Sequence, residues 1–385
     1  MKILFSRDID RDEWNRLVRE SATGTWFQTP EAYDFFGSMP DLFKPFVVGI
    51  EAYPQQCSTD DHRQSDRAEL FTHKGKGAMT AHMQQTLRAV CSGYVTVEKN
   101  PIKQFFTRRA IIIGGPALAD DCTDEEVSEL MKAIRNGAQW RNDTTPLVNG
   151  ELMSPIYIET RNFNDYSRWR SAFEEAGFAY QPHLNYHVDT SSVEIIDAHL
   201  GKSRKRDIRT TIREGVSVVE LTNERVSELE RERMVREYYE ILKNLYETKV
   251  KTPLFPESFF QTLAKHKDAR FLLTALDGKI IGGTVCVAQE GKCLYEWFAC
   301  GEDGVYPHVF PSCYATYAGI RYAAEHGMPR FDMMGAGKPD EAYGVREFKA
   351  KFGGKEVEHG RFVCITKPLL YKIGVFGVKL LKKRK

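Results

Sequence analysis

Residues 330–362 read RFDMMGAGKPDEAYGVREFKAKFGGKEVEHGRF, and this stretch gives the clearest indication of the fold. It begins with Arg330–Met334, which we predict to be a strand that ends at small residues. Glycine allows a backbone to approach a ligand closely, so Gly335 and Gly337 are predicted to form the floor of a binding cleft.

A second stretch of the same design lies in the first half of the chain. Residues 111–118 read IIIGGPAL, which is again an apolar run that stops at small residues. Each half is predicted to contain a hairpin, a strand, a helix and a further strand. This duplication predicts an α/β (α+β) protein with two halves, each a mixed β-sheet flanked by helices.

Local signals place several elements. A helix is predicted from Thr123 to about Gly137, because acidic residues in a first turn suit the helix dipole. Residues 105–113 are predicted to be a strand, and Asp277-Gly278 is predicted to be a hairpin turn. Residues 202–213 are predicted to form a basic helix.

Length and composition suggest two domains of ordinary globular type. The chain has 385 residues, 42% hydrophobic and 28% charged, with a net charge of +1 that points to no particular partner. We predict a first domain at 1–160 with a mobile polar loop at 54–77. A second, catalytic domain is expected at 161–354, followed by a closing strand and a basic amphipathic tail at 355–385.

Cysteine usage and the N-terminus favour a cytoplasmic protein. The eight cysteines contain no CxxC pair, and we expect reduced, mostly buried thiols and no metal site. The N-terminus is charged from Arg7 onward and lacks the apolar core of a signal peptide. The sequence contains no run of ~18 apolar residues of the kind that spans a membrane.

Three segments resemble the FemABX-type aminoacyltransferases. The most specific is FKAKFGG at 348–354, after a strand that contains Asp and ends at Gly. The others are WFQTP at 26–30 and the basic helix 202–213, which Glu214-Gly215-Val216 follows. The resemblance spans about 25–366, nearly the whole chain.

This resemblance implies two GNAT-like acyltransferase domains and transfer of an aminoacyl group to an amine. The expected donor is charged tRNA, and the expected acceptor is a cell-wall precursor or related glycoconjugate, including a lipid-linked one. No bound cofactor is expected. An acyl-CoA-dependent N-acyltransferase is the alternative, although GEDGVYPHVFPSCYA (301–315) does not match the usual pyrophosphate-binding turn.

Three residues are the candidates for catalysis. In the family, the Phe-Lys pair faces the donor, so the resemblance implies that Lys349 holds a donor phosphate or the developing oxyanion. Asp332 and Glu296 are acids in apolar strands, and either could be the general base. Glu296 alternates with Leu294 and Phe298, which predicts one shared face. The structural alternatives are a surface lysine and acids paired with arginine.

The candidates for substrate binding come from the same segments. Aromatic rings could stack on a base or sugar or could simply pack the loop, and a row of basic residues could hold phosphates or be a solvated face. The residues in this group are Phe348, Phe352, Gly335, Gly337, Tyr343, Lys202, Arg206, Arg209 and Gln28.

The C-terminal segment 368–385 is apolar with lysines and ends in four basic residues, so peripheral contact with the inner face of a membrane is one prediction. Packing on the first domain is the alternative. The stretch 31–38 lacks a lysine that the family often has there. A non-catalytic RNA- or membrane-binding module on the same fold is therefore a third hypothesis.

Overall fold

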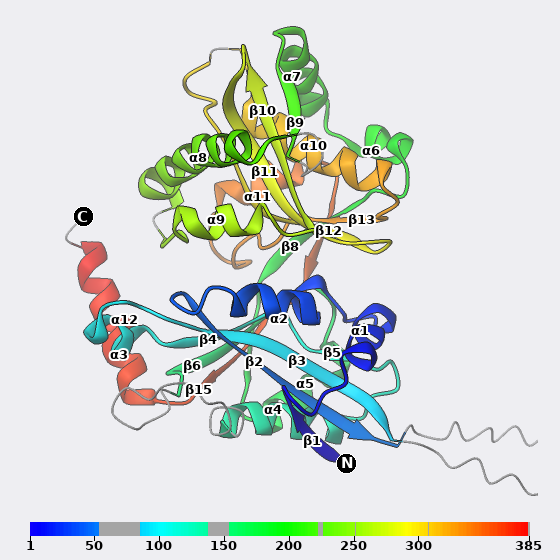
Figure 1. Cartoon of the computed structure of the whole chain (residues 1–385), viewed down its shortest axis with the longest axis vertical. Coiled ribbons are helices and arrows are strands. Elements are labelled where there is room, and N and C mark those ends of the chain that lie inside the picture. Colours follow the sequence, from blue (N-terminus) through cyan, green and yellow to red (C-terminus); the bar gives the residue numbers. More distant parts are fainter. Residues whose placement is uncertain (54–84, 138–153, 222–225, 251, 307, 384–385) are drawn as a thin grey trace, which may run out of the picture.

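The structure is a computed structural model that describes residues 1–53, 85–137, 154–221, 226–250, 252–306 and 308–383. The predicted loop at 54–77 lies outside these residues. The described chain forms two lobes, one above the other, and each lobe is built around one mixed sheet (Figure 1).

The sheet of the first lobe has the order β1-β2-β3-β4-β6-β15-β7, with β5 paired to β3. Its strands are β1 (Lys2–Phe5), β2 (Phe43–Ala52), β3 (Thr86–Thr96), β4 (Arg109–Gly114), β5 (Ala117–Leu118), β6 (Tyr157–Asn162), β7 (Ala179–Gln181) and β15 (Arg361–Ile365). The helices are α1 (Arg11–Glu20), α2 (Pro30–Gly37), α3 (Pro101–Thr107), α4 (Asp124–Asn136), α5 (Arg170–Glu175) and α12 (Pro368–Lys383).

The sheet of the second lobe has the order β14-β8-β13-β12-β11-β10-β9. Its strands are β8 (Leu184–Asp189), β9 (Ser217–Glu220), β10 (Ala269–Leu276), β11 (Lys279–Gln289), β12 (Cys293–Gly301), β13 (Arg330–Asp332) and β14 (Lys355–Glu358). The helices are α6 (Val193–His199), α7 (Lys202–Arg213), α8 (Glu228–Leu245), α9 (Glu257–Leu263), α10 (Pro311–Glu325) and α11 (Gly344–Ala350).

Local sequence chemistry accounts for several of these boundaries. Thr123 and Glu126 form a reciprocal capping box at the start of α4, which ends at Gly137 in the left-handed conformation. The predicted turn at Asp277-Gly278 is confirmed, with φ values of 50° and 77° between β10 and β11. The predicted basic helix at 202–213 is confirmed as α7.

One predicted strand was partly wrong. Residues 105–107 end helix α3, and the strand begins only at Arg109. Proline suits the first turn of a helix because its φ is already helical and its missing N–H is not needed there, and Pro101 starts α3. The aromatic residues at 105 and 106 had suggested a strand instead.

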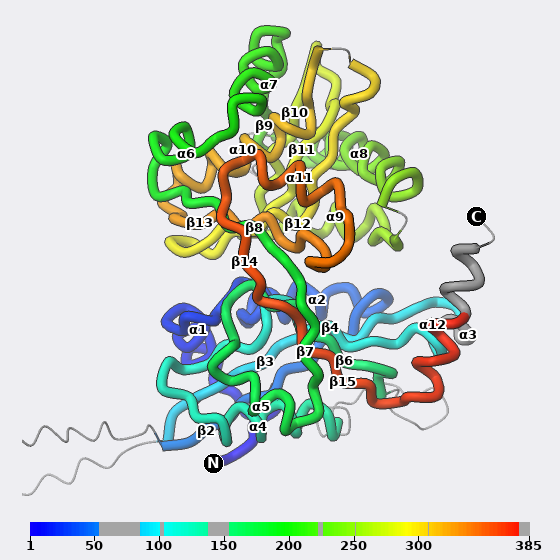
Figure 2. The backbone as a smooth tube through the Cα atoms, turned by 180° about the vertical axis from the view of Figure 1, so that it is seen from behind, coloured from blue at the N-terminus to red at the C-terminus, as the bar shows by residue number. Residues whose placement is uncertain are grey.

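The sheets divide the chain differently from the predicted boundaries. The change of lobe falls between β7 and β8 rather than at residue 160, and the chain returns to the first sheet at β15. Two adjacent connections therefore run between the lobes, one from β7 to β8 and one from β14 to β15 (Figure 2). The residues around these connections hold the polar cluster described below.

A continuous apolar core joins the lobes. It combines Trp26, Phe27 and Phe35 with residues of the second lobe such as Phe259 and Tyr295. The indole N–H of Trp26 also donates to Asp268 across the interface, at 2.9 Å. The seven cysteines in the described part of the chain are buried, as predicted.

Candidate functional site at the junction of the lobes

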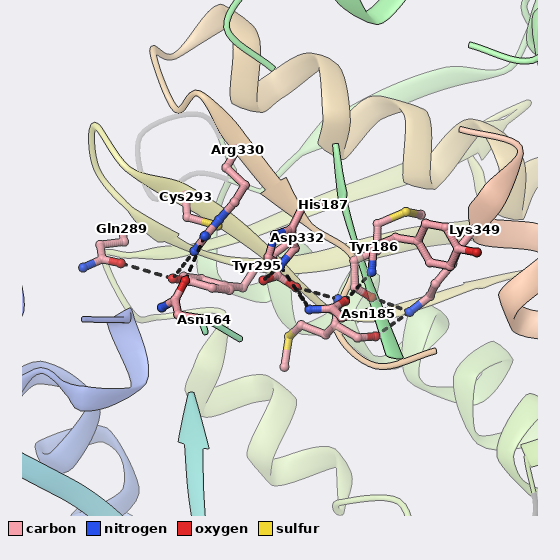
Figure 3. A network of polar contacts seen from close by, with 12 residues as sticks. Asn164, Asn185, Tyr186, His187, Gln289, Cys293, Tyr295, Arg330, Asp332 and Lys349 are labelled. Carbon is pink, nitrogen blue, oxygen red and sulfur yellow. Dashed lines mark hydrogen bonds and ion pairs between the residues drawn. The ribbon is translucent and has the colours of Figure 1, made fainter. Parts of the chain in front are cut away.

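Asp332 and His187 meet at the point where the two lobes join. Strands β13 and β8 are antiparallel, and Asp332 and His187 are direct register partners. His187 Nε2 lies 3.1 Å from Asp332 Oδ2 (Figure 3). The Asp332 side chain is fully buried, whereas the His187 side chain is 15% exposed. We call this pair the junction dyad.

The carboxylate of the dyad is firmly held. Its Oδ1 accepts hydrogen bonds from Asn185 Nδ2 at 2.7 Å and from the backbone N–H of Met334 at 2.9 Å. Burial raises the pKa of Asp332, but hydrogen bonding to His187 and the charges of His187 and Arg330 outweigh this effect and hold the pKa below its usual value. Asp332 is therefore ionised at neutral pH.

An ionised aspartate at Nε2 fixes the role of the imidazole. It favours the proton on Nε2, which leaves Nδ1 of His187 as the basic nitrogen. Within the described residues, no hydrogen bond is formed by that Nδ1. The ring of His359 lies close by, with a centroid separation of 5.4 Å. Such an arrangement is chemically able to accept a proton from a bound molecule.

The side chain of Lys349 points into the protein. Its side chain is buried, and its ammonium group donates to the carbonyl oxygens of Met333, Met334 and Gly335. All three N–H donors of the ammonium are thereby hydrogen-bonded to the backbone. Lys349 binds α11 to the segment after β13, so in this structure it positions that segment, and the predicted contact with a phosphate or oxyanion would require these bonds to break.

The segment that Lys349 holds is conformationally unusual. Met334 has a φ of 47°, which is uncommon for a residue other than glycine, and Gly335 and Gly337 also have positive φ. A Cβ on Gly337 would lie 3.0 Å from Tyr343, so glycine is needed for this close approach. Gly335 and Gly337 thus follow Asp332 closely in the chain, and the exposed Tyr343 packs near Gly337, while their contact with substrate stays a prediction.

Glu296 is the second acid that the sequence indicated. It is buried on β12 and accepts a hydrogen bond from Thr284 at 3.2 Å. Burial raises its pKa, and the nearby positive charge of Lys349 opposes this effect. The predicted face shared with Leu294 and Phe298 was wrong, because the pairing of β11 with β12 skips Trp297 and places Phe298 in the interlobe core.

The aromatic and glutamine candidates contact other groups of the protein. Phe352 is buried, and both Phe348 and Phe352 lie under the guanidinium of Arg204, at 4.4 and 5.0 Å. Packing therefore accounts for Phe352. Gln28 is fully buried and bonds to the backbone of Ser92 and Ile113, so it braces β3 against β4 and has no surface for a substrate. This corrects the expectation for Gln28.

The basic candidates lie on a separate surface. Lys202, Arg206 and Arg209 are exposed on α7, at the far end of the second lobe (Figure 1). Together with Lys205, Thr210 and Arg213 they line a shallow hollow of about 470 Å³. The start of α7 adjoins the end of α11 through a hydrogen bond from Gly201 N to Lys351 O at 3.1 Å.

A larger groove lies between the lobes. It has a volume of about 820 Å³ and is lined by residues of α1, Thr29 and the turn 289–292. A line of contacts leads from it toward the dyad. Gln289 accepts from Tyr295 OH at 3.2 Å, and Arg330 lies 3.5 Å from the same oxygen (Figure 3).

His187 and Asn185 were missed by the sequence analysis. Strand β8 has the sequence LNYHVD, and its alternation places both polar residues on one face. Two polar side chains on one face of a strand could have indicated a site. The partner strand could not be identified from the sequence, because β8 and β13 are separated by more than a hundred residues.

Comparison with known families supports an acyltransferase domain. The family described as "Acetyltransferase (GNAT) domain" matches residues 202–349, which include Glu296, Asp332 and Lys349. No curated protein sequence matches the chain significantly.

Two solved structures have a similar fold over nearly the whole chain. The crystal structure of FemX has a TM-score of 0.63 at 13% identity, over 97% of this chain and 99% of that one. The C-terminal domain of a putative lysylphosphatidylglycerol synthetase from Agrobacterium fabrum has a TM-score of 0.51 at 12% identity, over 96% and 95%. The predicted fold, with two mixed sheets flanked by helices, is thus confirmed and is similar to that of FemX, and a GNAT-type domain matches part of the second half.

Proposed function

We propose that this chain, an acyltransferase with a GNAT-type domain at 202–349, transfers an aminoacyl or acyl group to an amine at the junction of its two lobes. The observation that carries the proposal is the junction dyad. Asp332, at the end of strand β13 within the matched region 202–349, is buried and lies 3.1 Å from Nε2 of His187, which comes from strand β8 outside that region.

The dyad supplies the proton transfer that such a reaction needs. The amine nitrogen attacks the carbonyl carbon of the donor, and a C–N bond forms as the ester C–O or thioester C–S bond breaks. His187 Nδ1 accepts the proton from the attacking amine and returns it to the leaving hydroxyl or thiol. Asp332 orients the ring and stabilises the imidazolium in between.

The donor we favour is charged tRNA, and the acceptor is an amine on a cell-wall precursor or related glycoconjugate. The exposed basic residues Lys202, Arg206 and Arg209 support this choice, because phosphates are bound by such rows of positive charge. Acyl-CoA is the alternative donor. The described residues offer no cluster of acids, histidines or cysteines that could hold a metal.

The test is a transfer assay with purified full-length protein. Charged tRNA and acetyl-CoA are offered separately with an amine-bearing muramyl peptide, and products are identified by mass. We expect a product with one of these donors. His187→Gln should lower kcat by about 10²-fold or more with little change in KM, in line with the usual value of a general base. The exposed His199→Gln is the matched control.

A chemical rescue separates catalysis from structure. His187→Ala should recover activity when imidazole is added, because free imidazole can then accept the proton, whereas a merely structural histidine would give no rescue. Full activity in His187→Gln would remove the dyad from the mechanism. Absence of product with either donor, with tRNA binding intact, would instead favour the non-catalytic module.

A further inference from the structure

Helices α3 and α12 lie side by side at one end of the first lobe (Figures 1 and 2). One side of α12 is fixed to the protein, because Tyr371 packs edge-on against Tyr157 with centroids 5.5 Å apart. A Cβ added at Gly374 would lie only 3.5 Å from the carbonyl oxygen of Phe106. The two helices are therefore in close contact.

The other side of α12 presents apolar side chains to solvent. Leu369, Ile373 and Phe376 have the spacing of a single helix face and are 78%, 55% and 65% exposed. Phe105 on α3 is also 47% exposed, and its ring lies 5.0 Å from that of Phe106. A helix face of this spacing normally packs on a core, so its exposure indicates an interaction surface. We call these residues the α3–α12 surface.

The two segments that carry this surface are rich in basic residues. Residues 366–385 contain seven Lys or Arg residues and no acid, and residues 99–119 contain four and no acid. Exposed Lys372 lies within the apolar face itself. The surface therefore combines apolar insertion with attraction to anions. A second copy of the chain would bring the same positive charge and be repelled.

We propose that the α3–α12 surface docks on an anionic lipid bilayer, with both helices lying in the interface. Apolar side chains would enter the boundary of the acyl chains while the lysines contact the lipid phosphates. The described helices include none long and apolar enough to cross a membrane. This inference is independent of the proposed reaction and goes beyond the C-terminal segment, because α3 is part of the surface.

The proposal is tested with the full chain and sedimented vesicles. We expect binding to phosphatidylcholine mixed with phosphatidylglycerol, weak binding to phosphatidylcholine alone, and a loss of binding at high salt. Phe376→Glu and Ile373→Glu should each weaken partitioning about tenfold or more, since each removes a large inserted side chain. Phe105→Glu should also weaken it, which tests the part played by α3.

Leu229→Glu is the matched control, because Leu229 is 80% exposed on α8 of the other lobe. It should bind vesicles as the wild type does, and thermal unfolding should show that all variants are folded. Binding that is equal in Phe376→Glu and wild type would overturn the proposal. A wild-type dimer in light scattering that Phe376→Glu dissociates would also overturn it, because a second copy would then cover the surface.

Discussion

The ammonium of Lys349 lies 2.9 Å from the carbonyl oxygen of Gly335, so helix α11 is fastened to the segment that follows strand β13. The same ammonium donates to Met333 and Met334. This arrangement holds Met334 in its unusual backbone conformation beside Asp332, to which the Met334 N–H donates. The geometry of the junction dyad thus depends on a lysine that is directed inward.

Replacing this lysine should reduce stability. Lys349→Met leaves three buried carbonyl oxygens without their donor, and we expect a loss of about 2–4 kcal/mol in the free energy of unfolding. Chemical denaturation measures this loss, with the exposed Lys351→Met as the control. An unchanged free energy of unfolding together with a large rise in donor KM would instead support the phosphate-holding role.

Removing the charge of the dyad aspartate should abolish most activity. Asp332→Asn can no longer stabilise the imidazolium and favours the wrong tautomer of His187, so we expect kcat to fall by about 10²–10⁴-fold. Steady-state kinetics on the transfer reaction measure this fall. Asp189→Asn, an exposed aspartate on β8, the strand that carries His187, should keep wild-type kinetics. Comparable losses in both variants would argue against a specific role for the dyad.

The histidines around the junction should make the fold acid-sensitive. Burial lowers the pKa of His359 to about 4 and that of His183 to about 4, from an unfolded value of about 6.5. Because the folded pKa is depressed, the stability contributed by the neutral rings is present above pH ~6.5 and is lost as the pH falls toward 4.

His359→Gln should therefore lose less Tm than the wild type between neutral pH and pH 4, as followed by thermal unfolding. The exposed His199→Gln should follow the wild type. Parallel curves for His359→Gln and the wild type would show that the His359 ring does not resist protonation.

Glu296 should give the fold a pH dependence of stability opposite to that of the histidines. Burial raises its pKa, so its contribution to stability is greatest below the unfolded pKa and is lost as the pH rises through the folded pKa. Glu296→Gln keeps the oxygen that accepts from Thr284 but cannot ionise. Its Tm relative to the wild type should rise as the pH increases from acid to neutral and above. A difference in Tm that is constant with pH would contradict this.

The basic hollow on α7, lined by residues such as Lys202, Arg206 and Arg209, should bind the phosphates of tRNA without contacts to its bases. Arg209→Glu should weaken binding of charged tRNA and lower the salt slope of log Kd by about 0.7–0.9 for each phosphate that the protein no longer neutralises. Filter binding at several salt concentrations gives the slope. Lys243→Glu, on α8 of the same lobe with a side chain that is 45% exposed, is the matched control. If the salt slope of log Kd is the same in both variants, the basic residues of α7 do not contact tRNA.

Two residues of the candidate site could be identified from the sequence, one from its local pattern and one from the family resemblance. Asp332 was noticed as an acid in an apolar strand, and Lys349 through the FKAKFGG segment. Neither pattern reveals the direction of a side chain. The structure turns Lys349 inward to backbone carbonyls, and it buries Gln28 of the WFQTP segment between strands.

By itself, the sequence determined the elements whose signals are local. The capping box of α4, the Asp277-Gly278 turn and the basic helix α7 each depend on residues a few positions apart. Only the tertiary structure decided the pairing of β8 with β13, the exchange of strands between lobes at β15, and the skip at Trp297. These features depend on contacts between distant segments, and strand register is set by packing rather than by the strand's own residues. The junction dyad belongs to this second group.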